Sequence, residues 1–230
     1  MTDLNTRMPP GNDVAQRTAM KPAFSDDLLD AVLQRANLQH AWKQVRANKG
    51  AAGVDGMTID EFPVWVRVGH WTVVEQSIRS GDYQPAPVRR VDIDKPDGGK
   101  RQLGIPTVTD RVIQQAIAQI LMPLFDPEFS TDSYGFRPGR NAHQAVRRVQ
   151  SILKEGRRFA VDVDLSKFFD RVNHDLLMTH LGRKVRDKRL LALMARYLRA
   201  GIIDNQFYLE SREGVPQGGA IVASAGQHHA

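Results

Sequence analysis

Two aspartates set two residues apart are the side chains best suited to chemistry in this sequence of 230 residues. Asp162 and Asp164 lie in the stretch FAVDVDLSKFFDRVNH, where they alternate with Val161, Val163 and Leu165. The alternation has the period of a β-strand and predicts both carboxylates on one face. Neighbouring carboxylates repel each other, and a divalent cation or a basic ligand relieves that repulsion. The pattern fits such a site, and it fits equally an edge strand with a solvated acidic face.

The composition indicates a globular protein with an anionic partner. Hydrophobic residues make up 41% of the chain, which permits a real core, and the net charge is +6. No long apolar run is present, so we expect nucleic acid as the partner and no membrane. The absence of cysteine excludes disulfides, thiolate zinc sites and cysteine nucleophiles. No signal peptide is visible, and we expect a cytoplasmic protein.

A basic hairpin is predicted upstream of the aspartates. The sequences VRRVDID and KRQLGIP flank the turn KPDGG, one of the strongest turn signals that a sequence offers. The hairpin carries five cations, at Arg89, Arg90, Lys95, Lys100 and Arg101. Cations crowded on one ribbon repel each other without an anion, which favours a phosphate-binding surface over a hairpin kept soluble by its charges.

A second basic element is predicted between the hairpin and the aspartates. In the loop DSYGFRPGR, the aromatic residue Tyr134 is followed by Arg137 and Arg140, a mixture suited to base stacking and bidentate phosphate contacts. Asn141 then caps a helix with an apolar face running from Ala142 to Leu153. Its outer face carries Arg147 and Arg148.

The remaining patterns predict mainly helices and a second hairpin. Helical stripes begin at Ser25, Thr58, Trp71, Thr109, Asn173 and Asp187, and residues 202–209 read as a short hairpin. The fold class is therefore α+β, mainly helical, with short antiparallel hairpins and one acidic strand. We expect a flexible leader over residues 1–23, one domain over 24–219, and a divergent tail over 220–230.

With these blocks together, the chain resembles the reverse transcriptase domain of group II intron-encoded proteins. Four blocks occur in the family's order: VRRVDIDKPDGGKRQLGIPTVTDRVIQQAIAQIL, DSYGFRPGRNAHQAV, VDVDLSKFFDRVNHDLL and GVPQGG. Four ordered blocks are far stronger evidence than a single short motif. The resemblance implies the fingers and a partial palm of a right-hand polymerase, which acts on an RNA template, a DNA primer and dNTPs.

The resemblance also implies roles for individual residues. Asp164 matches the family's first catalytic aspartate, a ligand of the Mg²⁺ ions in two-metal phosphoryl transfer, and Phe169 matches the aromatic gate against a 2′-hydroxyl. Gln217 matches the lining of the nucleotide pocket. The hairpin residues Arg90, Lys95 and Arg101 fall where the fingers grip the triphosphate.

The sequence departs from the family pattern after Gly219. The family continues with a P-L-S-P segment and a Y-A-D-D turn whose aspartates complete the metal site, whereas these residues read AIVASAGQHHA. One carboxylate does not hold two Mg²⁺ ions against hydration, so we expect the isolated chain to be catalytically incomplete. Three accounts stay open: a polymerase piece completed by a second chain, a non-catalytic module that binds intron RNA, and a degenerate remnant.

Overall fold

A computed structural model gives the fold, and it describes residues 26–94, 98–165 and 167–215. The first half contains α1 (Leu28–Leu33), α2 (Arg35–Asn48), α3 (Phe62–Arg67), α4 (His70–Ser80), β1 (Val88–Asp94), β2 (Lys100–Ile105) and α5 (Val108–Phe125). The second half contains the 3₁₀ turn η1 (Asp126–Glu128), α6 (Ala142–Lys154), η2 (Phe169–Arg171), α7 (His174–Gly182), α8 (Lys188–Arg199), β3 (Ile202–Asp204) and β4 (Phe207–Leu209). The expected leader and tail lie outside the described residues.

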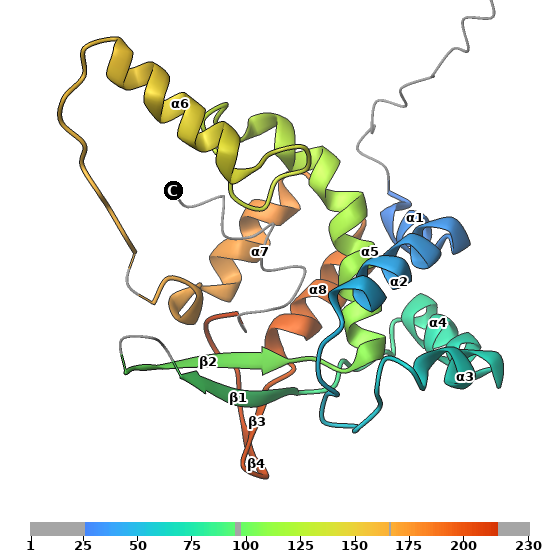
Figure 1. Cartoon of the computed structure of the whole chain (residues 1–230). Helices are drawn as coiled ribbons and strands as arrows, with labels where there is room; N and C mark the ends of the chain where they lie inside the picture. The colour runs from blue at the N-terminus through green and yellow to red at the C-terminus, as the bar shows by residue number, and fades with distance from the viewer. Residues whose placement is uncertain (1–25, 95–97, 166, 216–230) are drawn as a thin grey trace, which may run out of the picture.

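Helix α5 is the centre of the molecule. It packs against α1 and α2, and α8 contacts both α1 and α7, so these helices enclose one apolar core (Figure 1). Thr107 caps α5, because its side chain accepts a hydrogen bond from the N–H of Asp110. The fully buried residues of α5 include Ile113, Ile117 and Leu121, which recur at helical spacing and anchor the core.

The two predicted hairpins form and join into one sheet. Strand β1 pairs with β2 antiparallel, and β3 pairs with β4 antiparallel. A short parallel contact between β1 and β3 gives the strand order β2-β1-β3-β4. The mainly helical α+β fold with short hairpins is therefore confirmed, and the parallel junction between the hairpins is an addition to it.

The predicted acidic strand is wrong for this structure. Residues 159–165 have no strand conformation, and the side chains of Val161 and Val163 are 89% and 77% exposed. A strand needs hydrogen-bond partners along at least one edge, and none of the four described strands pairs with this segment. The sequence of this segment alternates as a strand would, but no described residue pairs with it in a sheet.

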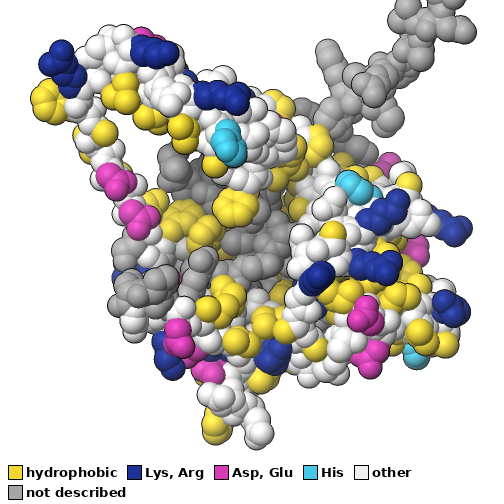
Figure 2. Space-filling view, viewed as in Figure 1, with side chains coloured by type: hydrophobic (Ala, Val, Ile, Leu, Met, Phe, Trp, Pro, Cys, Tyr) yellow, Lys and Arg dark blue, Asp and Glu magenta, His cyan; other side chains and the backbone are white. Residues whose placement is uncertain are grey.

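Helix α6 also lacks the core contacts that its sequence predicts. Asn141 caps it as expected and forms a reciprocal capping box with Gln144. No residue of α6 is buried, and Val146, Val149 and Leu153 are each more than half exposed. The helix lies apart from the core, with hydrophobic side chains along the side that faces the rest of the molecule (Figures 1 and 2). The expected inner face of α6 is thus solvent-exposed.

Within the described ranges, no helix is both long enough and apolar enough to cross a lipid bilayer.

Candidate functional site

A backbone clamp joins the turn after the aspartates to the start of the GVPQGG block. The N–H of Val215 donates to the carbonyl oxygen of Phe169 at 2.7 Å, and the N–H of Gly214 donates to the carbonyl oxygen of Val172 at 2.8 Å. The ring of Phe169 packs edge-on against Phe168, with 5.3 Å between the ring centroids. Two blocks distant in sequence therefore meet here, and Phe169 is held beside the segment that leads to Gln217.

His174 and Gly214 complete this clamp, and sequence reasoning missed both. The buried imidazole Nε2 of His174 lies 2.7 Å from the carbonyl oxygen of Gly214, so Nε2 carries the proton and donates it. Gly214 has a φ of 78°, and a Cβ at this position would lie 2.7 Å from the carbonyl oxygen of Asp170. Only glycine fits both constraints. The sequence signal for Gly214 was its place as the first glycine of the GVPQGG block. No sequence pattern marked His174.

The predicted metal ligand lies on the exposed segment. Asp162 and Asp164 are both exposed, and the described residues contain no group of three or more His, Cys, Asp or Glu side chains that could hold a metal ion. Mg²⁺ prefers several oxygen ligands at fixed geometry. The described residues therefore do not fit a complete Mg²⁺ site, and Asp164 offers at most one carboxylate to one.

The predicted triphosphate grip is only partly described. Arg90 forms an ion pair with Asp204 at 3.0 Å and also donates to Gln102, so a triphosphate would compete with these partners. Arg101 lies in β2 opposite Ile93. Lys95 and Gln217 lie outside the described residues. The nucleotide-binding roles of these four residues stay predictions.

The other hairpin cations for which the structure describes contacts also have partners within the chain. Arg89 donates to the carbonyl oxygen of Ala52 at 2.7 Å and 3.1 Å, and Lys100 lies 3.9 Å from the carboxylate of Asp92. Carboxylates of the chain thus lie beside Arg90 and Lys100, whereas the partner of Arg89 is an uncharged carbonyl. The preference for a phosphate-binding surface on this hairpin therefore stays a prediction.

Arg137 is built into the loop between η1 and α6. Its guanidinium is buried and donates to the carboxylate of Asp126 at 2.7 Å and to the carbonyl oxygens of Ser130 and Ser133. These hydrogen bonds hold the pKa of Asp126 below its usual range. Here Arg137 shapes the loop from inside, which differs from the direct phosphate contact predicted for it.

The loop and α6 nevertheless present basic and aromatic groups at the surface. The guanidinium of Arg140 lies over the ring of Tyr134 at 5.4 Å from its centroid, a cation–π contact. Arg147 is exposed and forms no hydrogen bond or ion pair with the described residues. Arg148 is paired with Asp132 at 2.9 Å, and this contact lowers the pKa of Asp132. Lys and Arg side chains lie along the outer side of α6 in Figure 2.

Comparisons with known proteins give one consistent result. Residues 93–227 match the family "Reverse transcriptase (RNA-dependent DNA polymerase)". The chain is 38% identical to Protein YkfC of Escherichia coli (strain K12) over 84% of its length and 52% of that relative. It is 35% identical to the Group II intron-encoded protein LtrA of Lactococcus lactis subsp. cremoris, over 79% of the chain and 30% of that relative.

Among solved structures, the chain is similar to a "Partial Cas6-RT-Cas1--Cas2 complex" with a TM-score of 0.57 and 22% sequence identity. The match covers 86% of this chain and 33% of that one. At this identity the likeness supports the fold alone. The chain spans about half the length of YkfC and less than a third of LtrA.

Proposed function

Because the chain belongs to the reverse transcriptase family, with group II intron-encoded proteins among its relatives, we propose that these residues form polymerase fingers and a partial palm that is catalytically incomplete alone. In the reaction of a complete enzyme, the 3′-hydroxyl of a primer attacks the α-phosphate of a dNTP, and pyrophosphate leaves. The clamp at Phe169 and Gly214 supports a nucleotide pocket at this place.

The observation that carries this proposal is the placement of Asp164. Its segment is exposed and unpaired with any described strand, and the described residues supply no further grouped carboxylates. The apolar face of α6 is exposed as well. The unpaired backbone of residues 159–165 and the exposed apolar face of α6 support the view that further polypeptide completes the palm. A second chain is one source of that polypeptide.

The direct test is primer extension with the 230-residue chain alone. We expect no incorporation with an RNA template, a DNA primer, dNTPs and Mg²⁺, while a complete group II intron reverse transcriptase extends the primer in the same buffer. Incorporation by a nuclease-free preparation that disappears in the Asp164→Ala variant would show that the proposal is wrong.

A second function, binding of intron RNA without chemistry, is favoured by the surface of the loop and α6. Arg140 and Tyr134 offer a charged and aromatic pair, and Arg147 is an exposed cation without a described partner. Arg137 fixes the loop that presents them. Such a surface binds single-stranded RNA by stacking and by phosphate contacts.

This function predicts a salt-dependent loss of RNA affinity on removal of single cations. Arg140→Ala and Arg147→Ala should each weaken binding of a labelled single-stranded RNA, and each lost phosphate contact should reduce the slope of log K against log salt by about 0.7. Fluorescence anisotropy at several salt concentrations measures both quantities.

Two matched variants show whether RNA binding is confined to the loop and α6. Arg67→Ala removes the same charge from α3, away from α6 (Figure 1), and should change affinity little. Asp164→Ala should leave affinity intact. Equal losses in the Arg67→Ala and Arg147→Ala variants would indicate a non-specific response to net charge and contradict a defined surface.

A further inference from the structure

The hairpin of β3 and β4 ends the sheet with an open edge. A two-residue turn, Asn205–Gln206, connects the strands, and both residues have positive φ. Strand β4 is the last in the order β2-β1-β3-β4, so within the described residues no strand lies on its other side. The hairpin projects from the body at the end opposite α6, which leaves this edge accessible (Figure 1).

The open edge carries both backbone and apolar groups that lack a cover. In a two-residue hairpin the closing pair, Asp204 and Phe207, exchanges hydrogen bonds, so the N–H and C=O of Tyr208 point away from β3. The side chains of Phe207 and Tyr208 are 74% and 56% exposed. Soluble proteins protect such edges by keeping the strand short or by placing lysine or proline in it; β4 is short, with three residues, but has neither lysine nor proline.

The edge is held in a fixed position by packing. The ring of Tyr208 lies directly on Gly201, where an added Cβ would come within 2.5 Å of the ring. Gly201 in turn accepts a hydrogen bond from the N–H of Val88, the first residue of β1. The outward groups of Tyr208 are therefore presented by a rigid element, which lowers the entropic cost of pairing with another strand.

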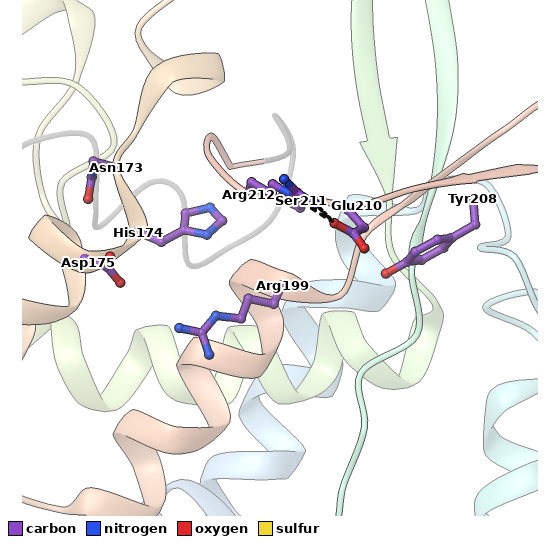
Figure 3. Close-up of a pocket in the computed structure, with 8 residues that line it drawn as sticks. All are labelled: Asn173, His174, Asp175, Arg199, Tyr208, Glu210, Ser211 and Arg212. Atoms are coloured by element: carbon purple, nitrogen blue, oxygen red, sulfur yellow. Dashed lines mark hydrogen bonds and ion pairs between the residues drawn. The ribbon is translucent and has the colours of Figure 1, made fainter.

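A pocket beside β4 carries charges of both signs (Figure 3). It has a volume of about 430 Å³ and is lined by Arg199, Arg212, Asp175 and Glu210 together with Tyr208. Arg212 and Glu210 pair with each other at 2.9 Å. Arg199 makes no hydrogen bond or ion pair with the described residues. A balanced pocket of this kind suits a self-complementary protein surface better than a polyanion such as RNA.

We propose that two copies of the chain associate through β4, with the strands antiparallel across a twofold axis and Tyr208 opposite Tyr208. In this arrangement the two outward N–H and C=O groups satisfy each other, and Phe207 of each copy faces Leu209 of the other. The two four-stranded sheets then join into one.

Cysteine crosslinking tests this register, because the natural chain contains no cysteine. Opposed residues of an antiparallel pair have Cα atoms about 4.5–5.5 Å apart, within the range that a disulfide spans. A Tyr208→Cys variant of the full chain should therefore crosslink to itself under mild oxidation. Phe207→Cys and Leu209→Cys should each crosslink slowly alone and quickly when mixed.

The matched control is Val146→Cys, which places a thiol at an equally exposed apolar position on α6. We expect Tyr208→Cys to crosslink at least about tenfold faster than this control, because a fixed geometry raises the effective concentration of the thiols. Analytical ultracentrifugation of the natural chain should show a dimer that Leu209→Lys dissociates and Val146→Lys does not.

A natural chain that stays monomeric at high concentration, with Tyr208→Cys no faster than Val146→Cys, would overturn the proposal and leave the edge to a different polypeptide. Dimers lost in Val146→Lys and kept in Leu209→Lys would overturn it equally, since they would place the interface on α6.

Discussion

Asp164→Asn should abolish primer extension, by at least about a thousandfold, in an enzyme that has been completed with a palm and thumb segment carrying the Y-A-D-D turn. The substitution keeps the size of the side chain and removes its charge, and an amide is a far weaker ligand than a carboxylate for a hard cation. The expectation rests on the proposed function. The measurement is the rate of nucleotide incorporation by the completed enzyme, supplied as two chains or as one fusion.

Asp162→Asn is the matched control for this experiment. It removes the same charge from the same exposed segment, two residues away. If Asp162 is a supporting acid, the rate should fall by no more than about tenfold, the effect of a lost accessory interaction of roughly 1.4 kcal/mol. If both variants lost the same amount of activity, the reaction would depend on the total negative charge of the segment and not on Asp164 in particular. If the Asp164→Asn enzyme stayed active, Asp164 would not be a metal ligand.

Local signals in the sequence predicted much of the fold. The side chains of Asn141, Asn173 and Asp187 each accept hydrogen bonds from backbone N–H groups at the start of α6, α7 and α8, as their positions before helical stripes indicated. The turn chemistry between β1 and β2 and between β3 and β4 likewise predicted both hairpins. These features depend on residues only a few positions apart.

Features that depend on distant parts of the chain could not be predicted in the same way. The parallel contact of β1 with β3 joins Val88 to Ile202, and no local pattern encodes it. Arg137 has the same side chain as Arg140, but only the fold places one inside the loop and the other over Tyr134. The apolar stripes of α6 and of residues 159–165 predict faces that pack against something, but both faces are exposed here, and amphipathicity does not identify a packing partner.

Asp110 is a buried acid whose loss should strongly destabilise the fold. Asp110 is only 1% exposed. Its carboxylate accepts hydrogen bonds from the hydroxyls of Tyr83 at 2.7 Å, Thr107 at 2.7 Å and Tyr197 at 3.0 Å. The N–H of Ala86 donates to it at 3.3 Å. The carboxylate therefore ties the start of α5 to α8 and to the segment before β1.

We expect Asp110→Ala to lower the free energy of unfolding by about 3 kcal/mol, because it creates a small cavity and leaves buried hydroxyls without their acceptor. Tyr83→Phe and Tyr197→Phe each remove one donor without stranding a buried partner, so each should cost about 1 kcal/mol. Urea denaturation followed by circular dichroism measures all three. A loss for Asp110→Ala no larger than that for Tyr83→Phe would contradict the shared-acceptor role.

The pH dependence of stability, compared between the natural protein and an Asp110→Asn variant, gives an independent check. Burial raises the pKa of Asp110, and the hydrogen bonds from Thr107, Tyr83 and Tyr197 offset only part of that rise. A raised pKa means that the stability contributed by protonated Asp110 is fully present below the ordinary aspartate pKa and is lost as the pH rises through the raised value. Natural protein should thus lose stability relative to Asp110→Asn, which cannot titrate, as the pH rises across this interval. A difference that is flat or of opposite sign would show that the four donors outweigh burial and keep Asp110 charged.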